Sequence, residues 1–219
     1  MAVTIRNRAT AFVAAGAPYN LPFVPLPTSA LVLAMICRQG VTYPAGAAPA
    51  GWTARGRGSG SGDAYQVCTA PGTVLSVPAT GQVGDANRHY VVLEVDGGAH
   101  ASAQAAVGAV MATPVVSGTV APTDAGQPGA AVAVALGLGG DFPEACWWND
   151  VPGWTKEYCG TFAAGGFHPW WAVFSRAYPA LPASVSDTFP NGWGGWNAQV
   201  TMLTLGPSAG APGVMPRIW

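Results

Sequence analysis

An internal repeat limits the possible folds of this 219-residue chain more than any other feature. The tripeptide Gly-Trp-Thr occurs at 51–53 and again at 153–155, which is 102 positions later. Self-similarity at a fixed spacing predicts two copies of one structural unit. Glycine before tryptophan suits a tight turn that folds the indole back over a core, where its N–H meets a carbonyl group. We therefore expect six structural anchors: Gly51, Trp52, Thr53, Gly153, Trp154 and Thr155.

Similar segments flank both copies of the tripeptide. An apolar run precedes each one, at 31–35 and at 133–136, and a shift of 102 positions places Val134 on Val32. An aromatic segment follows each copy, Tyr-Gln-Val in the first and Trp-Ala-Val in the second, and a further apolar run closes each unit. The sequence therefore predicts two similar halves of four strands each.

Eight segments have the composition of short strands, because they are rich in β-branched or aromatic residues and end at turn residues. They are 30–37, 64–69, 73–78, 89–95, 115–120, 131–138, 169–175 and 198–205. No helical segments separate them, which favours an antiparallel arrangement. Only 99–111 has helix-forming composition, and its glycine and the following Pro114 limit a helix to a turn or two.

Four strands alone bury too little apolar surface to be stable, so the two halves should pack face to face. We expect an all-β, jelly-roll-like antiparallel β-sandwich with halves at about 28–120 and 121–206. Residues 1–27 should form an N-terminal arm and first strand. The Pro- and Gly-rich segment 207–219 should form a C-terminal arm, and arms of this kind can lie along the sheet edge of a neighbouring subunit.

Composition and charge exclude two classes of partner. Nine basic residues and a net charge of −1 provide no stripe that could follow a phosphate backbone, so we expect no nucleic-acid partner. The apolar runs are each too short to cross a bilayer, so we expect no membrane partner. The first residues lack the ordered regions of a signal peptide, which favours a cytoplasmic protein. Only 9% of the residues are charged, so small polar residues or neighbouring subunits must cover much of the surface.

Four cysteines, Cys37, Cys68, Cys146 and Cys159, form no Cys-x-x-Cys pair. The preference of cysteine for burial favours isolated buried thiols. A Cys146–Cys159 disulfide across a strand pair is the second interpretation. A metal site with His168 is the third, although two cysteines and one histidine leave the usual tetrahedral zinc set one ligand short.

Paired catalytic groups are scarce in the sequence. Asp150 and Glu157 could flank a glycosidic bond, but turn capping and solvation account better for such carboxylates. Glu94 and Asp96 lie two residues apart on one strand face. The Gly-Ser string at 58–62 lacks the following helix of a serine nucleophile, and the three histidines are far apart in sequence. We therefore expect a non-enzymatic protein without catalytic, cofactor-binding or metal-binding residues.

Nine tryptophans are an unusually large share for this length, and most of them cluster. Adjacent residues of a strand point to opposite faces, so only one of Trp170 and Trp171 can join the core. Tryptophan is enriched at protein interfaces and also stacks on sugar rings. The expected contacts to a protein partner or a glycan are Trp147, Trp148, Trp170, Trp193, Trp196 and Trp219.

The order of an apolar strand, Gly-Trp-Thr, an aromatic strand and a closing apolar strand, present twice, resembles tailed-bacteriophage virion proteins of the minor tail or fibre-like class. The matching positions are 30–53, 64–67, 90–96, 131–155, 170–174 and 198–205. The resemblance implies a virion subunit that is assembled in the host cytoplasm and functions in assembly and host attachment. Its implied partners are other virion proteins, copies of itself and host cell-surface glycan. A carbohydrate-binding adhesin module and a capsid decoration protein are the alternative functions.

Overall fold

The structure is a computed structural model, and it describes residues 3–14, 16–37, 48–60, 63–79, 88–97, 104–107, 115–137, 146, 148–161, 170–190 and 198–207. The strands of the first half are β1 (Thr4–Val13), β2 (Tyr19–Asn20), β3 (Ala30–Cys37), β4 (Thr53–Gly60), β5 (Asp63–Pro71), β6 (Ser76–Val77) and β7 (Arg88–Asp96). Those of the second half are β8 (Gln104–Val107), β9 (Val115–Val116), β10 (Gly129–Gly137), β11 (Thr155–Thr161), β12 (Trp170–Tyr178), β13 (Thr188–Phe189) and β14 (Ala198–Leu205). No helix occurs in the described ranges.

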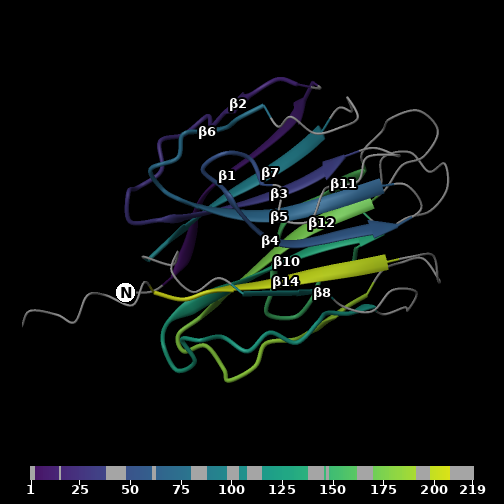
Figure 1. Ribbon diagram of the computed structural model, residues 1–219. Coiled ribbons are helices and arrows are strands. Elements are labelled where there is room, and N and C mark those ends of the chain that lie inside the picture. The colour runs from purple at the N-terminus through teal and green to yellow at the C-terminus, as the bar shows by residue number, and fades with distance from the viewer. Residues whose placement is uncertain are drawn as a thin grey trace, which may run out of the picture.

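Two five-stranded antiparallel sheets form a sandwich (Figure 1). The first has the strand order β1-β7-β3-β5-β4, and the second has the order β11-β12-β10-β14-β8. One apolar core contains side chains from both sheets, among them Val32 of β3 and Val132 of β10. A hydrogen bond of 2.6 Å between the hydroxyl groups of Tyr65 and Thr201 joins the sheets inside this core. The predicted all-β sandwich is confirmed.

The two sheets have corresponding strand orders. The order β1-β7-β3-β5-β4 corresponds to β8-β14-β10-β12-β11, and the short pair β2–β6 corresponds to β9–β13. Each sheet contains five strands, whereas the sequence predicts four in each half. The first sheet ends with β7 at Asp96, and the second begins with β8 at Gln104, which pairs with β14. The boundary between the halves therefore lies before the predicted boundary near residue 120. The origin of both halves from one duplicated unit stays a prediction.

Each sheet is also covered on its outer side, so the molecule has four layers. Over the first sheet, Trp52 and Val77 form a cluster with outward-facing residues of β3 such as Leu33. Over the second sheet, Trp154 and Phe189 form a similar cluster with outward-facing residues of β10. The central strands are therefore buried on both faces, which explains why their sequences are apolar throughout instead of alternating.

The repeated Gly-Trp-Thr tripeptide joins an outer layer to its sheet in each half. Both glycines have positive φ angles, 83° at position 51 and 79° at position 153, which glycine adopts without steric cost. The indole N–H of Trp52 donates to the carbonyl of Ser76 over 3.1 Å, and that of Trp154 donates to the Asp187 carboxylate over 2.8 Å. Both tryptophans are buried, so they act as anchors between layers.

The strand registers place Val132, and not Val134, at the position of Val32. In the first half, Val32 pairs with Thr69, which on its other side pairs with Thr53. In the second half, Val132 pairs with Ser175, which on its other side pairs with Thr155. The segment between the strand and the tripeptide is therefore two residues longer in the second half. Because side chains alternate with a period of two, this difference leaves inward and outward positions unchanged.

Three of the longer strands lie where the sequence predicts no strand, and all three are edge strands: β4, β8 and β11. The fourth edge strand, β1, is the first strand expected within residues 1–27. Residues Thr4–Val13 are hydrogen-bonded to β7, so they do not form a free N-terminal arm. Residues Gln104–Val107 are a strand, so the helical interpretation of 99–111 is wrong there. The expected strands at 73–78 and 115–120 contribute only the two-residue strands β6 and β9. Of the C-terminal arm expected at 207–219, residues 208–219 lie outside the described residues.

Three of the four edge strands carry a charged residue at an irregularity. The pairing registers shift at Arg6 in β1, at Arg55 in β4 and at Glu157 in β11. The last two shifts occur at corresponding positions, two residues after the threonine of each tripeptide. Bulges and charges on edge strands discourage pairing with further strands. These edges are therefore poor sites for strand addition by a partner.

Candidate functional site

One end of the sandwich is defined by the ends of β3 and β10, and we call it the loop end. The registers align the end of β3 with the start of β7, and the end of β10 with the starts of β12 and β14. A contact between His89 of β7 and Trp171 of β12 shows that both sheets share this end.

The tryptophans expected at a contact surface have different positions. Trp148 is 1% exposed and belongs to the outer core of the second sheet, so the prediction that it contacts a partner is wrong. Trp171 is buried in the central core, and Trp170 precedes it on β12. Outside the described residues lie Trp147, Trp193, Trp196 and Trp219, together with the side chain of Trp170.

A disulfide joins Cys146 to Cys159 of β11. The interpretation of these two cysteines as isolated thiols is therefore wrong, and the bridged alternative holds. The disulfide attaches the segment that contains buried Trp148 to edge strand β11. Cys68 is a buried free thiol, and burial raises its pKa to about 12 despite the opposing effect of Arg55, so it is a poor nucleophile.

We expect reduction of this disulfide to lower the free energy of unfolding by about 2–3 kcal/mol, given a loop of 13 residues. Urea denaturation with and without reductant measures the loss. The double variant Cys146→Ser/Cys159→Ser is the control, because reductant should not change its stability further. A reductant effect of the same size in that variant would contradict the assignment of the loss to this bridge.

An aromatic cluster at the loop end surrounds His89. The Trp171 indole N–H donates to His89 Nδ1 over 3.1 Å, and the Tyr158 hydroxyl lies 3.3 Å from the same nitrogen. The ring of Phe12 stacks on the imidazole with 4.2 Å between centroids and an interplanar angle of 5°. His89 is 2% exposed, whereas Phe12 is 66% exposed. The cluster thus holds an exposed apolar ring in a fixed orientation at this end of the molecule.

Burial lowers the pKa of His89 from 6.5 to about 4, which makes stability depend on pH. Below pH 6.5 the unfolded chain binds a proton that the folded chain does not, so stability falls as the pH falls towards 4. We expect a loss of about 2 kcal/mol between pH 7 and pH 5, measured by urea denaturation. The His89→Gln variant should show a flatter profile over this window. An equal slope in both proteins would contradict the prediction.

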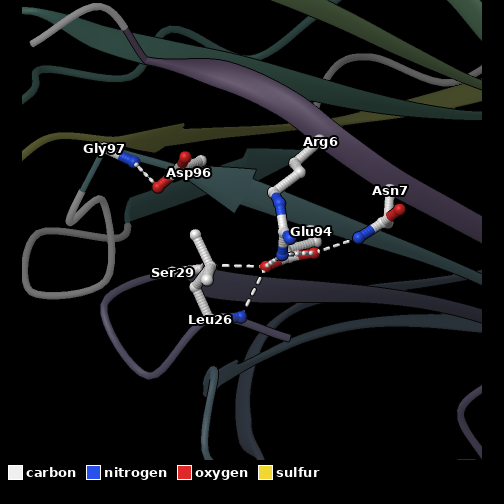
Figure 2. A network of polar contacts seen from close by, with 7 residues as sticks. All are labelled: Arg6, Asn7, Leu26, Ser29, Glu94, Asp96 and Gly97. Atoms are coloured by element: carbon white, nitrogen blue, oxygen red, sulfur yellow. Dashed lines mark hydrogen bonds and ion pairs between the residues drawn. The ribbon is translucent and has the colours of Figure 1, made fainter. Parts of the chain in front are cut away.

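Glu94 of β7 is a fully buried carboxylate at the opposite end, and Figure 2 shows its contacts. Its oxygens accept hydrogen bonds from Arg6 at 3.1 Å, Asn7 at 2.5 Å, the Leu26 backbone N–H at 2.7 Å and the Ser29 hydroxyl at 2.6 Å. Burial alone would raise the pKa of Glu94, but these donors together lower it below its usual value. The carboxylate fastens edge strand β1 to the connection that leads into β3.

A pocket of about 330 Å³ lies between edge strands β1 and β11. Its apolar lining is Val3, Ile5, Ala130 and Ala177, and its polar lining is Thr4, Thr155, Glu157, Ser175 and Arg176, together with Gly153. The bulge in β11 directs the Glu157 side chain to the Ser175 hydroxyl, which donates to it over 2.5 Å. The Arg8 guanidinium lies 3.7 Å from the same carboxylate.

Asp150 and Glu157 have separate partners. Asp150 is 92% exposed and pairs with Lys156 at 2.7 Å, whereas the Glu157 side chain is 8% exposed and contacts Ser175 and Arg8. Asp150 and Glu157 thus contact different partners and do not contact each other in these interactions. Gly58–Gly60 belongs to β4, so the expected loop at 58–62 begins as strand, and Ser61 lies outside the described residues.

In the part of the chain that the structure describes, no three His, Cys, Asp or Glu side chains gather as metal ligands would. His168, the histidine of the third interpretation of the cysteines, lies outside that part, as does His100. The described ranges also hold no helix with the length and hydropathy of a membrane-crossing segment. Comparison of the chain with family models, curated proteins and solved structures found no match.

Proposed function

We propose that the chain is a structural subunit of a tailed-phage virion, of the minor tail class, that contacts neighbouring subunits through its loop end. The observation that carries this proposal is the ring of Phe12, which is exposed and stacks on buried His89 at this end of the sandwich. The ends of a rigid β-sandwich are where such folds usually present a recognition surface. The resemblance of the repeated strand plan to virion proteins supplies the class of assembly.

The other surfaces of the described structure are less suited to a partner. The outer face of each sheet is already covered by the chain's own outer layer. Three edges carry charged residues at bulges, which discourages strand addition. At the loop end, by contrast, Phe12 exposes two thirds of its side chain and is held by stacking on His89. A preoriented apolar ring suits an interface, since little entropy is lost when a partner covers it.

The buried polar groups support a structural rather than a catalytic role. Glu94 is occupied by four donors, and His89 accepts a hydrogen bond from Trp171. Glu157 is engaged by a hydroxyl group and a guanidinium group. These contacts join strands to one another, and none of them leaves two carboxylates facing across a cleft as glycoside hydrolysis requires.

Incorporation into particles tests the proposal. We expect Phe12→Ser to lower the copy number per particle at least tenfold, because it removes the exposed apolar ring from the loop end. Val24→Ser is the matched control, since Val24 is 77% exposed and lies on the approach to Leu26 at the other end. Both variants should unfold near the wild-type midpoint. Equal incorporation of the two variants would contradict the assignment of the interface.

A further inference from the structure

The pocket between β1 and β11 is a second candidate for binding, separate from the loop end. Its volume of about 330 Å³ lies at the lower end of the range for small-molecule sites. Both walls are held in place by buried contacts. The Glu94 network, shown in Figure 2, fixes β1. The Glu157–Ser175 hydrogen bond fixes the bulged part of β11 against β12. A site with fixed walls does not need to be ordered by its ligand.

The charges that line the pocket are already compensated. Glu157 has Arg8 as its counter-ion at 3.7 Å, and Arg176 has Asp187 at 3.6 Å. The Arg176 guanidinium also lies over the ring of Tyr178, 5.0 Å from its centroid. A charged ligand would add an unmatched charge beside one of these pairs, whereas an uncharged ligand would leave both intact.

The pocket offers both hydrogen-bond acceptors and hydrogen-bond donors. Glu157 offers acceptor lone pairs beyond those used by its present partners, and Arg176 and Thr155 offer N–H and O–H donors. Hydroxyl groups can both donate and accept hydrogen bonds. A sugar ring, which bears several hydroxyl groups, can therefore pair with both the acceptors and the donors of the pocket. The apolar side chains of Val3 and Ile5 can cover the C–H face of the same ring.

We propose that this pocket binds a single neutral hexose unit, with Glu157 accepting from one hydroxyl group and Arg176 donating to another. The unit comes either from a free sugar or from the end of a glycan. The proposal is independent of the role of the loop end, because the pocket lies at the β1 and β11 edge near the start of both strands.

Ligand titration followed by NMR chemical shifts of the full chain tests this. The probes are D-glucose, D-galactose, D-mannose and N-acetyl-D-glucosamine, with D-glucuronate and D-glucosamine as charged counterparts. We expect millimolar binding of at least one neutral sugar, with binding of the charged analogues at least tenfold weaker. A trisaccharide that ends in the bound sugar distinguishes the sources: tighter binding indicates a glycan end, and equal or weaker binding indicates a free sugar.

Two variants locate the binding in this pocket. Ala177→Phe adds a large side chain at an exposed pocket residue, so it should fill the pocket without disturbing the core. Glu157→Gln removes the acceptor charge. Each should weaken binding at least tenfold, whereas Leu75→Ser, an exposed position on the outer layer, should leave it unchanged. Absence of binding by all four neutral sugars, or unchanged binding by Ala177→Phe, would overturn the proposal.

Discussion

Replacement of Glu94 by leucine is expected to lower the free energy of unfolding by about 3–5 kcal/mol, because removal of one partner leaves buried polar groups unsatisfied. The groups that would lose their acceptor are the Arg6 guanidinium, the Asn7 side-chain amide, the Ser29 hydroxyl and the Leu26 N–H. The effect should be strongest in β1, whose amide protons should exchange faster. Urea denaturation and hydrogen exchange measure the two consequences.

Asp96→Asn is the matched control, since Asp96 lies on the same strand and its side chain accepts a hydrogen bond from the neighbouring Gly97 N–H. It should cost less than about 1 kcal/mol. The stability due to Glu94 is present above pH 4.5 and is lost as the pH falls through the lowered pKa of the folded state. A loss in Glu94→Leu no larger than that in Asp96→Asn would contradict the role of the network.

Replacement of either anchor tryptophan by alanine is expected to cost about 3–5 kcal/mol, because each indole fills a cluster between a sheet and its outer layer. Trp52→Phe and Trp154→Phe should cost less, since they keep an aromatic ring and lose mainly the hydrogen bond to Ser76 or Asp187. The two alanine variants should behave alike, because both residues have the same place in corresponding halves.

Thermal and urea unfolding of the four tryptophan variants test this expectation. The exposed Leu75→Ser variant serves as a control for surface substitutions. If one alanine variant were as stable as the wild type while the other unfolded, the two tripeptides would not have equivalent roles. The structural basis for treating the halves as similar would then be limited to their strand order.

The sequence predicts the central strands well for a physical reason. Strands β3, β7, β10 and β14 are buried on both faces, so their apolar runs are continuous and easy to recognise. The edge strands lack this signal. β4 reads Thr-Ala-Arg-Gly-Arg-Gly-Ser-Gly, which has no apolar run and, apart from Thr53, none of the residues that favour strands. Its pairing with β5 depends on tertiary context, which local patterns do not contain.

The polar network and the pocket could not be predicted because their residues are distant in sequence. Glu94 was recognised beside Asp96, but its partner Arg6 lies 88 residues away along the chain. Arg8 and Glu157 are 149 residues apart. Trp148 was expected at a surface because it belongs to a tryptophan cluster, yet the nearby disulfide and the outer layer enclose it. Spacing alone distinguishes neither a buried indole from an exposed one nor a bridged cysteine from a free one.

Quantitative mass spectrometry of gradient-purified particles from the source of this chain tests the proposed assembly role most directly. The account predicts a fixed number of copies per particle, retained through a high-salt wash, because an apolar contact at the loop end is not screened by ions. Recovery of the chain only at the top of the gradient, free of particles, would contradict the claim that it is a structural subunit.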